Sequence, residues 1–353
     1  MSNTLHALVL AGGSGMRFWP LSRRATPKQL LRLFGGQTLL EETVRRLEGL
    51  IPAENILVLT NDEQVASVRA ALPGHPAENI FSEPEKRDTA AAIALGVGLV
   101  AARNPDATMV VLPADARIGD RTAFQSDLQA AADAAEQSGQ LVTIGVTPTW
   151  ACPGFGYIER GERFAGKVPD TYEVVRFREK PNPDLAESFF RSGNFFWNAG
   201  IFVWTVRSIL SEFNRHAPDL GEFVSVVRNT PDLRKEISER FPTLRKLSID
   251  YAILEKTNRV LVKAATFDWD DVGSWTALGK YLNQLRHHNA ANCPLSVENS
   301  SHNIVFSNDG VHVALLGVND LVVVQTRDAL LICNRHEAEG IKHLVANLPK
   351  ELQ

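Results

Sequence analysis

The sequence predicts an α/β protein with a doubly wound, mostly parallel sheet, followed by a small β unit. Through the first half of the 353 residues, short runs that are apolar on both faces alternate with stretches of helical spacing. This alternation is typical of parallel strands covered by helices on both sides. After about residue 284, short apolar runs separated by polar turns replace it. We therefore expect a large domain over residues 1–285 and a small β domain over residues 286–353.

The predicted strands of the first half share strand length and apolar residues on both faces. They are Leu5–Leu10, Asn55–Leu59, Met109–Leu112 and Leu141–Val146. The stretches between them that have helical spacing or a high alanine content are Thr38–Leu50, Asp88–Arg103 and Arg121–Ser138. The first of these stretches begins with Thr38, followed three residues later by Glu41. That spacing predicts a capping box at the start of the helix.

The second half alternates less regularly. Strands are expected at Thr171–Arg178, Ala199–Val206 and Arg259–Ala264, with a mainly helical stretch over Ile209–Tyr251. In the small β domain, the predicted strands are Ile304–Phe306, Val311–Leu315, Leu321–Val324 and Ala329–Cys333, followed by a helix over Glu337–Asn347. This spacing suggests stacked short strands. Exposed strands of such a unit often pair with a second copy, which leaves a homodimer open.

Composition and charge exclude several classes of protein. The formal net charge is -4 with acids and bases interspersed, so no basic field is available to hold a nucleic acid. The cysteines Cys152, Cys293 and Cys333 are far apart, which predicts free thiols and neither disulfides nor a zinc site. No basic stretch precedes the first apolar run, and no apolar run approaches the ~20 residues of a membrane-spanning helix. A cytoplasmic protein with no membrane partner is expected.

A glycine-rich turn follows the first predicted strand. Its backbone N–H groups can approach phosphate oxygens without interference from side chains. Phe18 stands where a dinucleotide-binding turn requires its third glycine, and Gly15-Met16-Arg17 does not complete a Walker motif. Arg17 and Lys28 lie close enough in sequence to add two positive charges, which would suit a triphosphate. The alternative is a solvated basic surface.

Seven motifs in order then resemble the sugar-1-phosphate nucleotidyltransferase family, in its mannose-1-phosphate guanylyltransferase (GDP-mannose pyrophosphorylase) branch. They are LAGGSGMRFWPLSR from Leu10, PKQLL from Pro27, EPEKRDTA from Glu83, LPAD from Leu112, FREKP from Phe177, WNAGIF from Trp197 and WDDVGSW from Trp269. The resemblance implies a Rossmann-like nucleotide-binding domain with a C-terminal unit of left-handed β-helix type. Some relatives carry a fused isomerase domain, and we expect a monofunctional form here.

The resemblance also implies the reaction. The family joins a sugar 1-phosphate to a nucleoside triphosphate with the help of Mg²⁺, and this branch uses GTP and mannose 1-phosphate to give GDP-mannose and pyrophosphate. A phosphate oxygen of the sugar attacks the α-phosphorus in line, so catalysis needs positioning and charge neutralisation and no histidine. The alternatives are an enzyme for another base or another sugar 1-phosphate, such as a heptose, and a catalytically silent nucleotide-sugar-sensing regulatory subunit.

The family motifs assign roles to residues of this chain. Catalytic residues are Arg17, Lys28, Asp115 and Lys180. Nucleotide-binding residues are Leu10, Ala11, Gly12, Gly13, Ser14, Gly15, Arg17, Lys28, Arg87, Thr89, Pro113 and Asp115. Sugar-phosphate-binding residues are Gly154, Gly156, Tyr157, Glu179, Lys180, Asn198 and Asp271. The metal ligands are Asp115, which follows a predicted strand at the edge where α/β sheets bind ligands, and Asp271.

Some assignments keep alternatives. Asp268 and Asp270 are close enough to Asp271 to replace it as the metal ligand. A salt bridge between Glu179 and Lys180 and a turn stabilised by Asn198 are the structural alternatives at the sugar site. At Asp88 the alternative is a helix N-cap with no contact to the nucleotide. Ala116 stands where the family usually has a histidine, which puts any contact of that imidazole in doubt.

Overall fold

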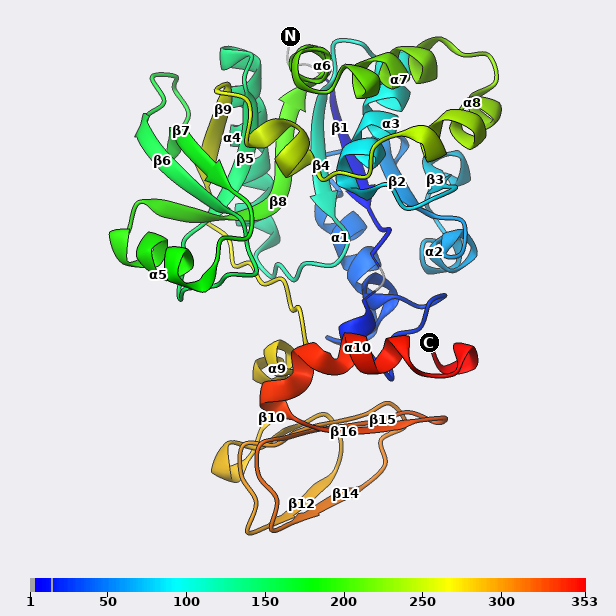
Figure 1. Cartoon of the computed structure of the whole chain (residues 1–353), viewed down its shortest axis with the longest axis vertical. Helices are drawn as coiled ribbons and strands as arrows, with labels where there is room; N and C mark the ends of the chain where they lie inside the picture. The colour runs from blue at the N-terminus through cyan, green and yellow to red at the C-terminus, as the bar shows by residue number, and fades with distance from the viewer. Residues whose placement is uncertain (1–3, 14) are drawn as a thin grey trace.

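The computed structural model describes residues 4–13 and 15–353. Figure 1 shows a large α/β domain, with the small β domain below it and helix α10 between the two. No helix in the described residues is long and apolar enough to cross a membrane. The three cysteines are free thiols, as the sequence predicts.

The large domain is built on one nine-stranded sheet with the order β3-β2-β1-β4-β8-β5-β9-β7-β6. Its strands are β1 (Leu5–Leu10), β2 (Ile56–Asn61), β3 (Ile80–Glu83), β4 (Thr108–Pro113), β5 (Leu141–Val146), β6 (Tyr157–Arg163), β7 (Thr171–Arg178), β8 (Phe195–Thr205) and β9 (Val260–Ala264). Only β7 and β8 run against the others among these strands, because β8 pairs antiparallel with β4, β5 and β6, and β7 with β6 and β9. The predicted mostly parallel sheet is confirmed.

Helices cover both faces of this sheet. They are α1 (Leu39–Leu47), α2 (Val65–Ala71), α3 (Asp88–Arg103), α4 (Arg121–Ser138), α5 (Pro183–Ser192), α6 (Val206–His216), α7 (Pro218–Asn229) and α8 (Leu233–Arg240). Successive strand residues point to opposite faces: Ala7 and Val9 pack into the core with α1 and α4, whereas Leu8 joins the core with α3, α6 and α7. The predicted capping box is present, since Thr38 and Glu41 each accept a hydrogen bond from the other's backbone N–H.

The small domain stacks short strands in register. One sheet contains β10 (Asn283–Gln284), β11 (Ala290–Ala291), β13 (Ile304–Ser307), β15 (Leu321–Gln325) and β16 (Leu330–Asn334), and a second contains β12 (Leu295–Glu298) and β14 (Val313–Leu316). Leu295 faces Val313 and Ile304 faces Val322, a spacing of 18 residues, whereas Ala290 faces Ile304 after only 14. Buried asparagines link the coils: Asn303 donates to Asn289 and accepts from the N–H of Leu321.

Two predicted elements of the small domain differ from the structure by more than one residue. The strand expected at Val311–Leu315 begins at Val313, because Val311 donates its N–H to the Ser307 hydroxyl and remains in the turn. The helix expected over Glu337–Asn347 is divided into the 3₁₀ segment η9 (Arg335–Gly340) and the α-helix α10 (Ile341–Ala346), with Gly340 at the junction.

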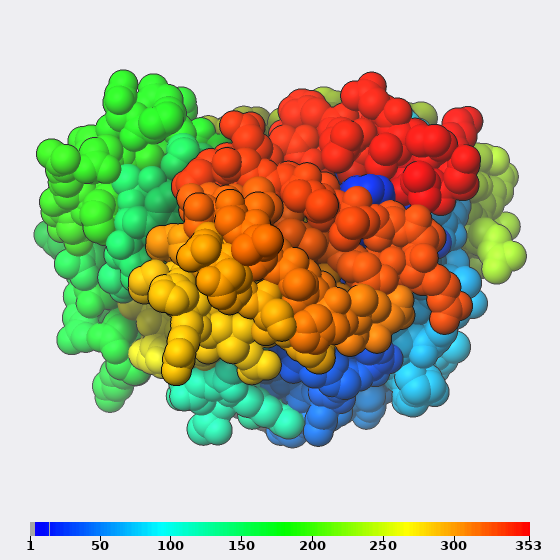
Figure 2. Space-filling view, turned by 90° about the horizontal axis from the view of Figure 1, so that it is seen from below, coloured from blue at the N-terminus to red at the C-terminus, as the bar shows by residue number. Residues whose placement is uncertain are grey.

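The two domains share a core. Trp275, in the short helix α9 (Trp275–Leu278), is fully buried between Phe18 and Phe306, with ring centroids 5.2 and 5.1 Å away. Its indole N–H donates to the carbonyl of Trp19 at 3.0 Å. Ile341 and Val345 of α10 belong to the same cluster. The C-terminal helix is therefore anchored against the segment that follows the glycine-rich turn, and Figure 2 shows the red C-terminal segment beside blue N-terminal atoms.

Candidate active site

The glycine-rich turn is held in place by the segment η2 (Lys28–Leu30). Gly15 has φ 59°, and a Cβ atom there would lie 2.3 Å from the backbone nitrogen of Lys28, so only glycine fits. The buried amide of Gln29 donates to the carbonyls of Ala11 and Gly13 at 2.6 and 3.2 Å. These contacts fix the shape of the turn. Ser14, a predicted nucleotide contact, lies outside the described residues.

Lys28 is buried and paired with the first predicted metal ligand. Its Nζ lies 3.0 Å from Asp115 Oδ2 and also donates to the carbonyl of Asp271. Burial disfavours the ammonium, but the charges of Asp115 and Asp271 outweigh burial and raise the pKa of Lys28 above its usual value. Lys28 therefore stays charged beside the Asp115 carboxylate and the backbone carbonyl of Asp271, the two residues that the sequence assigns to a metal.

Neighbouring hydrogen bonds separate Asp271 from its two alternatives. Asp268 accepts from the backbone N–H groups of Gly119 and Asp120, and Asp270 accepts from the Val272 N–H and the Tyr281 hydroxyl. Both carboxylates are thus engaged in fixing the turn. Asp271 instead lines a cavity with Asp115, and burial raises its pKa.

The pair of carboxylates suits a magnesium ion. No group of three or more His, Cys, Asp or Glu side chains in the described residues is arranged to hold a metal. Mg²⁺ commonly binds through one or two carboxylates and completes its shell with water and substrate phosphates. Asp115 and Asp271 offer this kind of oxygen donor, so these residues fit the ion that the family implies.

A cavity of about 240 Å³ joins these groups to the start of the 3₁₀ segment η1 (Met16–Phe18). We call it the phosphate cavity; it is lined by Gly15, Met16, Arg17, Phe18, Lys28, Asp115, Asp271, Gly273 and Lys342. The guanidinium of Arg17 forms an ion pair with Glu339 of η9, in which Arg17 Nε lies 2.7 Å from Glu339 Oε2. Residues of the C-terminal segment therefore reach the predicted triphosphate site.

A larger cavity of about 760 Å³ adjoins it at Met16. We call it the base cavity. Glu83 lies at its wall, 8% exposed, and a Cβ atom on Gly12 would come within 3.8 Å of its Oε2. Burial raises the pKa of Glu83 to about 8, with nearby Asp88 adding to the shift and Lys86 opposing it. A carboxylate in this position can accept hydrogen bonds from a base.

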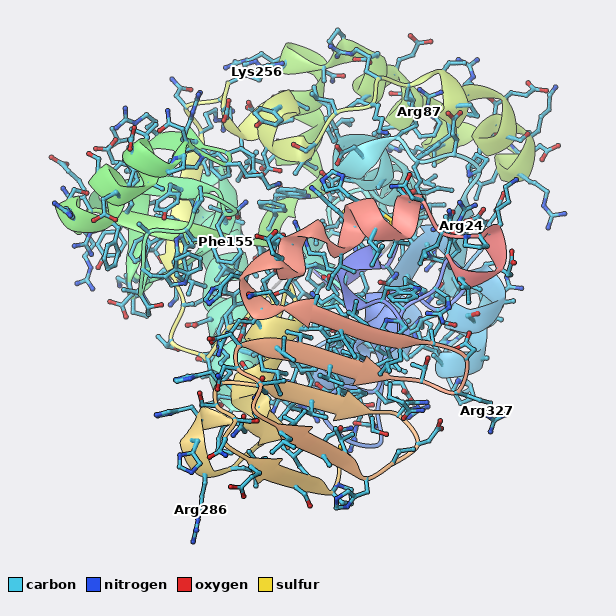
Figure 3. All side chains as sticks on the ribbon, turned by 60° about the horizontal axis from the view of Figure 1, so that its bottom comes forward. Arg24, Arg87, Phe155, Lys256, Arg286 and Arg327 are labelled. Atoms are coloured by element: carbon cyan, nitrogen blue, oxygen red, sulfur yellow. The ribbon has the colours of Figure 1, made fainter. Side chains whose placement is uncertain are left out.

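A third cavity of about 230 Å³ shares Asp115 and Asp271 with the phosphate cavity. We call it the sugar cavity; it is lined by Thr89, Pro113, Asp115, Ala116, Gly154, Phe155, Gly156, Glu179, Lys180, Asn198, Ala199, Gly200, Phe202, Ile249, Asp250, Trp269 and Asp271. In the view of Figure 3, Phe155 of this cavity and Arg24 of the base cavity lie on opposite sides, with α10 between them.

Polar side chains of the sugar cavity are linked to each other. Lys180 Nζ lies 2.8 Å from Glu179 Oε1, and Asn198 donates to Asp250 Oδ1 at 3.1 Å while accepting from the Gly200 N–H. The salt bridge and the turn contact considered from the sequence are both present, at the cavity wall. Asp250 begins a π-helical segment, and burial and the charge of Glu179 raise its pKa to about 7.

Other predicted residues lie away from their expected contacts. Tyr157 is fully buried behind the sugar cavity, where its hydroxyl accepts from the Cys152 N–H. Arg87 pairs with Glu85 at 2.9 Å and lines none of the three cavities in the described residues. Thr89 borders the sugar cavity, and its hydroxyl accepts from the Ile249 N–H.

The alternative interpretation of Asp88 as an N-cap is wrong, and two site residues were missed. Helix α3 begins at Asp88 itself, whose carboxylate accepts from the adjacent Thr89 N–H at 2.7 Å. Glu83 and Asp250 were not among the predicted site residues. Glu83 is the first residue of the family motif EPEKRDTA, and this position in a motif could have identified it as a site residue. Asp250 lies in a helical stretch that carries no such signal.

Comparisons with known proteins show which family the two domains belong to. The family model described as "Nucleotidyl transferase" matches residues 6–288, and "MannoseP isomerase/GMP-like beta-helix domain" matches residues 296–348. The second match confirms the β-helix character of the small domain. Mannose-1-phosphate guanylyltransferase of Klebsiella pneumoniae is 36% identical over 344 residues, which cover 96% of this chain and 72% of that protein.

Two further relatives cover nearly the whole chain. Mannose-1-phosphate guanylyltransferase ManC of Salmonella typhimurium is 37% identical over 354 residues, covering 98% of this chain and 73% of the relative. A crystal structure from Thermus thermophilus, described as a mannose-1-phosphate geranyltransferase, matches with a TM-score of 0.87 and 35% identity, covering 98% of this chain and 99% of that chain. The chain therefore belongs to the nucleotidyl transferase family, in the branch of the mannose-1-phosphate guanylyltransferases.

Proposed function

We propose that this protein transfers GMP from GTP to α-D-mannose 1-phosphate, giving GDP-mannose and pyrophosphate, with Mg²⁺ bound by Asp115 and Asp271. One observation carries the proposal: the three cavities are neighbours that share residues of their walls. Met16 borders both the base and the phosphate cavities, and Asp115 and Asp271 border both the phosphate and the sugar cavities. A base, a chain of phosphates and a sugar follow one another in the same order along the substrates.

In the reaction, the sugar phosphate is already an anion, so it attacks the α-phosphorus without a strong general base. The role of the protein is to hold attacking and leaving oxygens in line and to neutralise charge. Lys28 and Arg17 bind the triphosphate and stabilise the pyrophosphate as it leaves. Lys180 binds the phosphate of the sugar. A bound Mg²⁺ would supply Lewis-acid stabilisation of the phosphate oxygens.

Choice of base rests on Glu83 in this proposal. Guanine presents two adjacent donors, N1–H and N2–H₂, and an ionised carboxylate can accept from both. Adenine lacks that pair of donors. A buried acceptor left without its partner is costly, so such a site discriminates strongly against the wrong base.

Recognition of the sugar rests on Asp250 and Asn198. We expect Asp250→Asn to raise KM for mannose 1-phosphate about tenfold, because one charge-assisted hydrogen bond to a sugar hydroxyl is lost. KM for GTP should stay unchanged in the same initial-rate measurements. The control is Asp309→Asn, at an exposed position of the small domain. Equal KM values for the sugar in Asp250→Asn and the wild type would remove Asp250 from the sugar site.

Location, assembly and domain limits complete the proposal. We place the enzyme in the cytoplasm, with its catalytic domain over residues 1–285 and its β domain over residues 286–353. A homodimer through the β domain is supported by exposed apolar side chains on its surface, Leu316, Leu330 and Ile332, which are 73, 57 and 59% exposed.

The proposed specificity is tested by pyrophosphate release with magnesium. GTP, ATP, UTP, CTP and dTTP are each combined with the 1-phosphates of mannose, glucose and a heptose. We expect rapid release only with GTP and mannose 1-phosphate. Release with a different pair would contradict the choice of substrates while keeping the reaction class. Nucleotide binding without release in any combination would instead favour a regulatory subunit.

A further inference from the structure

The C-terminal helix places a second set of charges beside the phosphate cavity. Lys342 of α10 lines this cavity together with Lys28, Asp115 and Asp271, although it lies 71 positions beyond Asp271 in the chain. Glu339, three residues before Lys342, forms the 2.7 Å ion pair with Arg17. Two residues outside the seven family motifs thus reach the place where the triphosphate is expected.

The position of this helix is fixed by packing. Ala338, Ile341 and Val345 are buried in the same cluster as Phe18 and Trp275. Figure 1 shows α10 lying across the lower edge of the large domain, next to the dark blue segment that follows β1. A buried apolar side holds the helix against η1, so its polar residues face the cavity at a defined position.

The charges of the cavity are unevenly compensated. Lys28 is paired with Asp115, and Arg17 is paired with Glu339. Lys342 takes part in no ion pair with any described residue, and it is exposed at the cavity wall. It is therefore a cation available to a ligand. A triphosphate carries several negative charges. Its β- and γ-phosphates leave together as pyrophosphate.

We propose that η9 and α10 together complete the pyrophosphate subsite: Lys342 of α10 binds the β- and γ-phosphates, while Glu339 of η9 holds Arg17 in place and competes with the incoming phosphates for it. This inference rests on the proposed function for the identity of the ligand. The two residues act in opposite directions. Lys342 adds affinity for the phosphates, and Glu339 reduces it by occupying the guanidinium of Arg17.

The test measures binding of pyrophosphate in the presence of magnesium by titration calorimetry with the full chain. We expect Lys342→Ala to weaken binding about tenfold, the scale of one charge-assisted hydrogen bond, and Lys342→Arg to stay near the wild type. Glu339→Gln is expected to tighten binding about threefold, because Arg17 is released. Lys350→Ala, an exposed lysine of the same C-terminal segment, is the matched control and should bind as the wild type does.

The two variants are expected to change the affinity for pyrophosphate in opposite directions, which a merely structural role of these residues would not produce. If Lys342→Ala binds pyrophosphate like the wild type, or if Lys342→Ala and Glu339→Gln both weaken binding, the inference is wrong. In the reverse reaction, KM for GDP-mannose should be unchanged by Lys342→Ala, because that substrate lacks the two leaving phosphates. Calorimetry measures binding without turnover. If the variants show the expected changes in pyrophosphate binding but the protein does not turn over GTP and mannose 1-phosphate, the proposed function is wrong and this inference stands.

Discussion

Asp115→Asn is expected to lower kcat for GDP-mannose formation roughly a thousandfold, because the change removes both a proposed metal ligand and the partner of Lys28. The amide keeps the shape of the carboxylate but carries no charge. The Lys28 side chain, which is only 6% exposed, then loses the carboxylate with which it is paired. Initial rates at several magnesium concentrations measure the effect, and we expect excess magnesium to restore little of the activity.

The variant also removes one half of a partly buried ion pair and leaves the buried Lys28 without that partner, so it should lose stability as well. Thermal melting therefore accompanies the kinetics, and Asp271→Asn provides a second test at a residue that does not bond Lys28 through its side chain. Asp268→Asn is the matched control. Its carboxylate only accepts from Gly119 and Asp120, so it should lose stability and keep kcat within about threefold. Normal activity in folded Asp115→Asn would exclude the proposed metal site.

Glu83→Gln is expected to reduce kcat/KM for GTP about a hundredfold, with KM carrying most of the change. Glutamine keeps the size of the side chain but presents an N–H₂ group toward the donors of guanine. Inosine triphosphate lacks the N2 amino group, so it separates the two hydrogen bonds. The wild type should strongly prefer GTP to inosine triphosphate, whereas Glu83→Gln should lose that preference. Retained preference in the variant would show that other groups select the base.

The pKa of Glu83 gives this prediction a pH dependence. In the ligand-free protein its pKa is about 8, so the carboxyl group is mainly protonated below that pH. In the proposed function guanine binds the ionised form of Glu83, so KM for GTP should fall by up to about tenfold per unit as pH rises toward 8, then level off. Glu83→Gln serves as the control, because its KM should not change in this range. A KM that is flat with pH in the wild type would contradict the role of Glu83.

Much of the fold was predictable because most core elements carry strong local signals. The strand at Leu5–Leu10 and the helices at Asp88–Arg103 and Arg121–Ser138 have the predicted bounds. The elements that were missed are short or partly solvated. β3 has only four residues. β6 is buried mainly at its first two residues, and the polar residues Glu159, Arg160 and Glu162 that follow give no apolar pattern of a strand.

The sequence predicted the site residues that lie within motifs, and Lys28, Asp115 and Lys180, from three different motifs, all line the cavities. Arg17 and Lys28 were found from the sequence because they lie in one continuous segment around the glycine-rich turn. Asp271 could not be separated from Asp268 and Asp270 by sequence, because the difference is which carboxylate the surrounding N–H groups engage. Lys342 carries no local signal, since its place at the phosphate cavity depends on how α10 packs against η1.

The transfer of GMP is tested by following the α-phosphorus of GTP. The protein is incubated with magnesium, mannose 1-phosphate and GTP labelled at the α-phosphorus, and the products are separated. We expect the label in GDP-mannose, with unlabelled pyrophosphate formed in equal amount. Label remaining in GDP or in free GMP, with no labelled nucleotide sugar, would contradict attack by the sugar phosphate on the α-phosphorus.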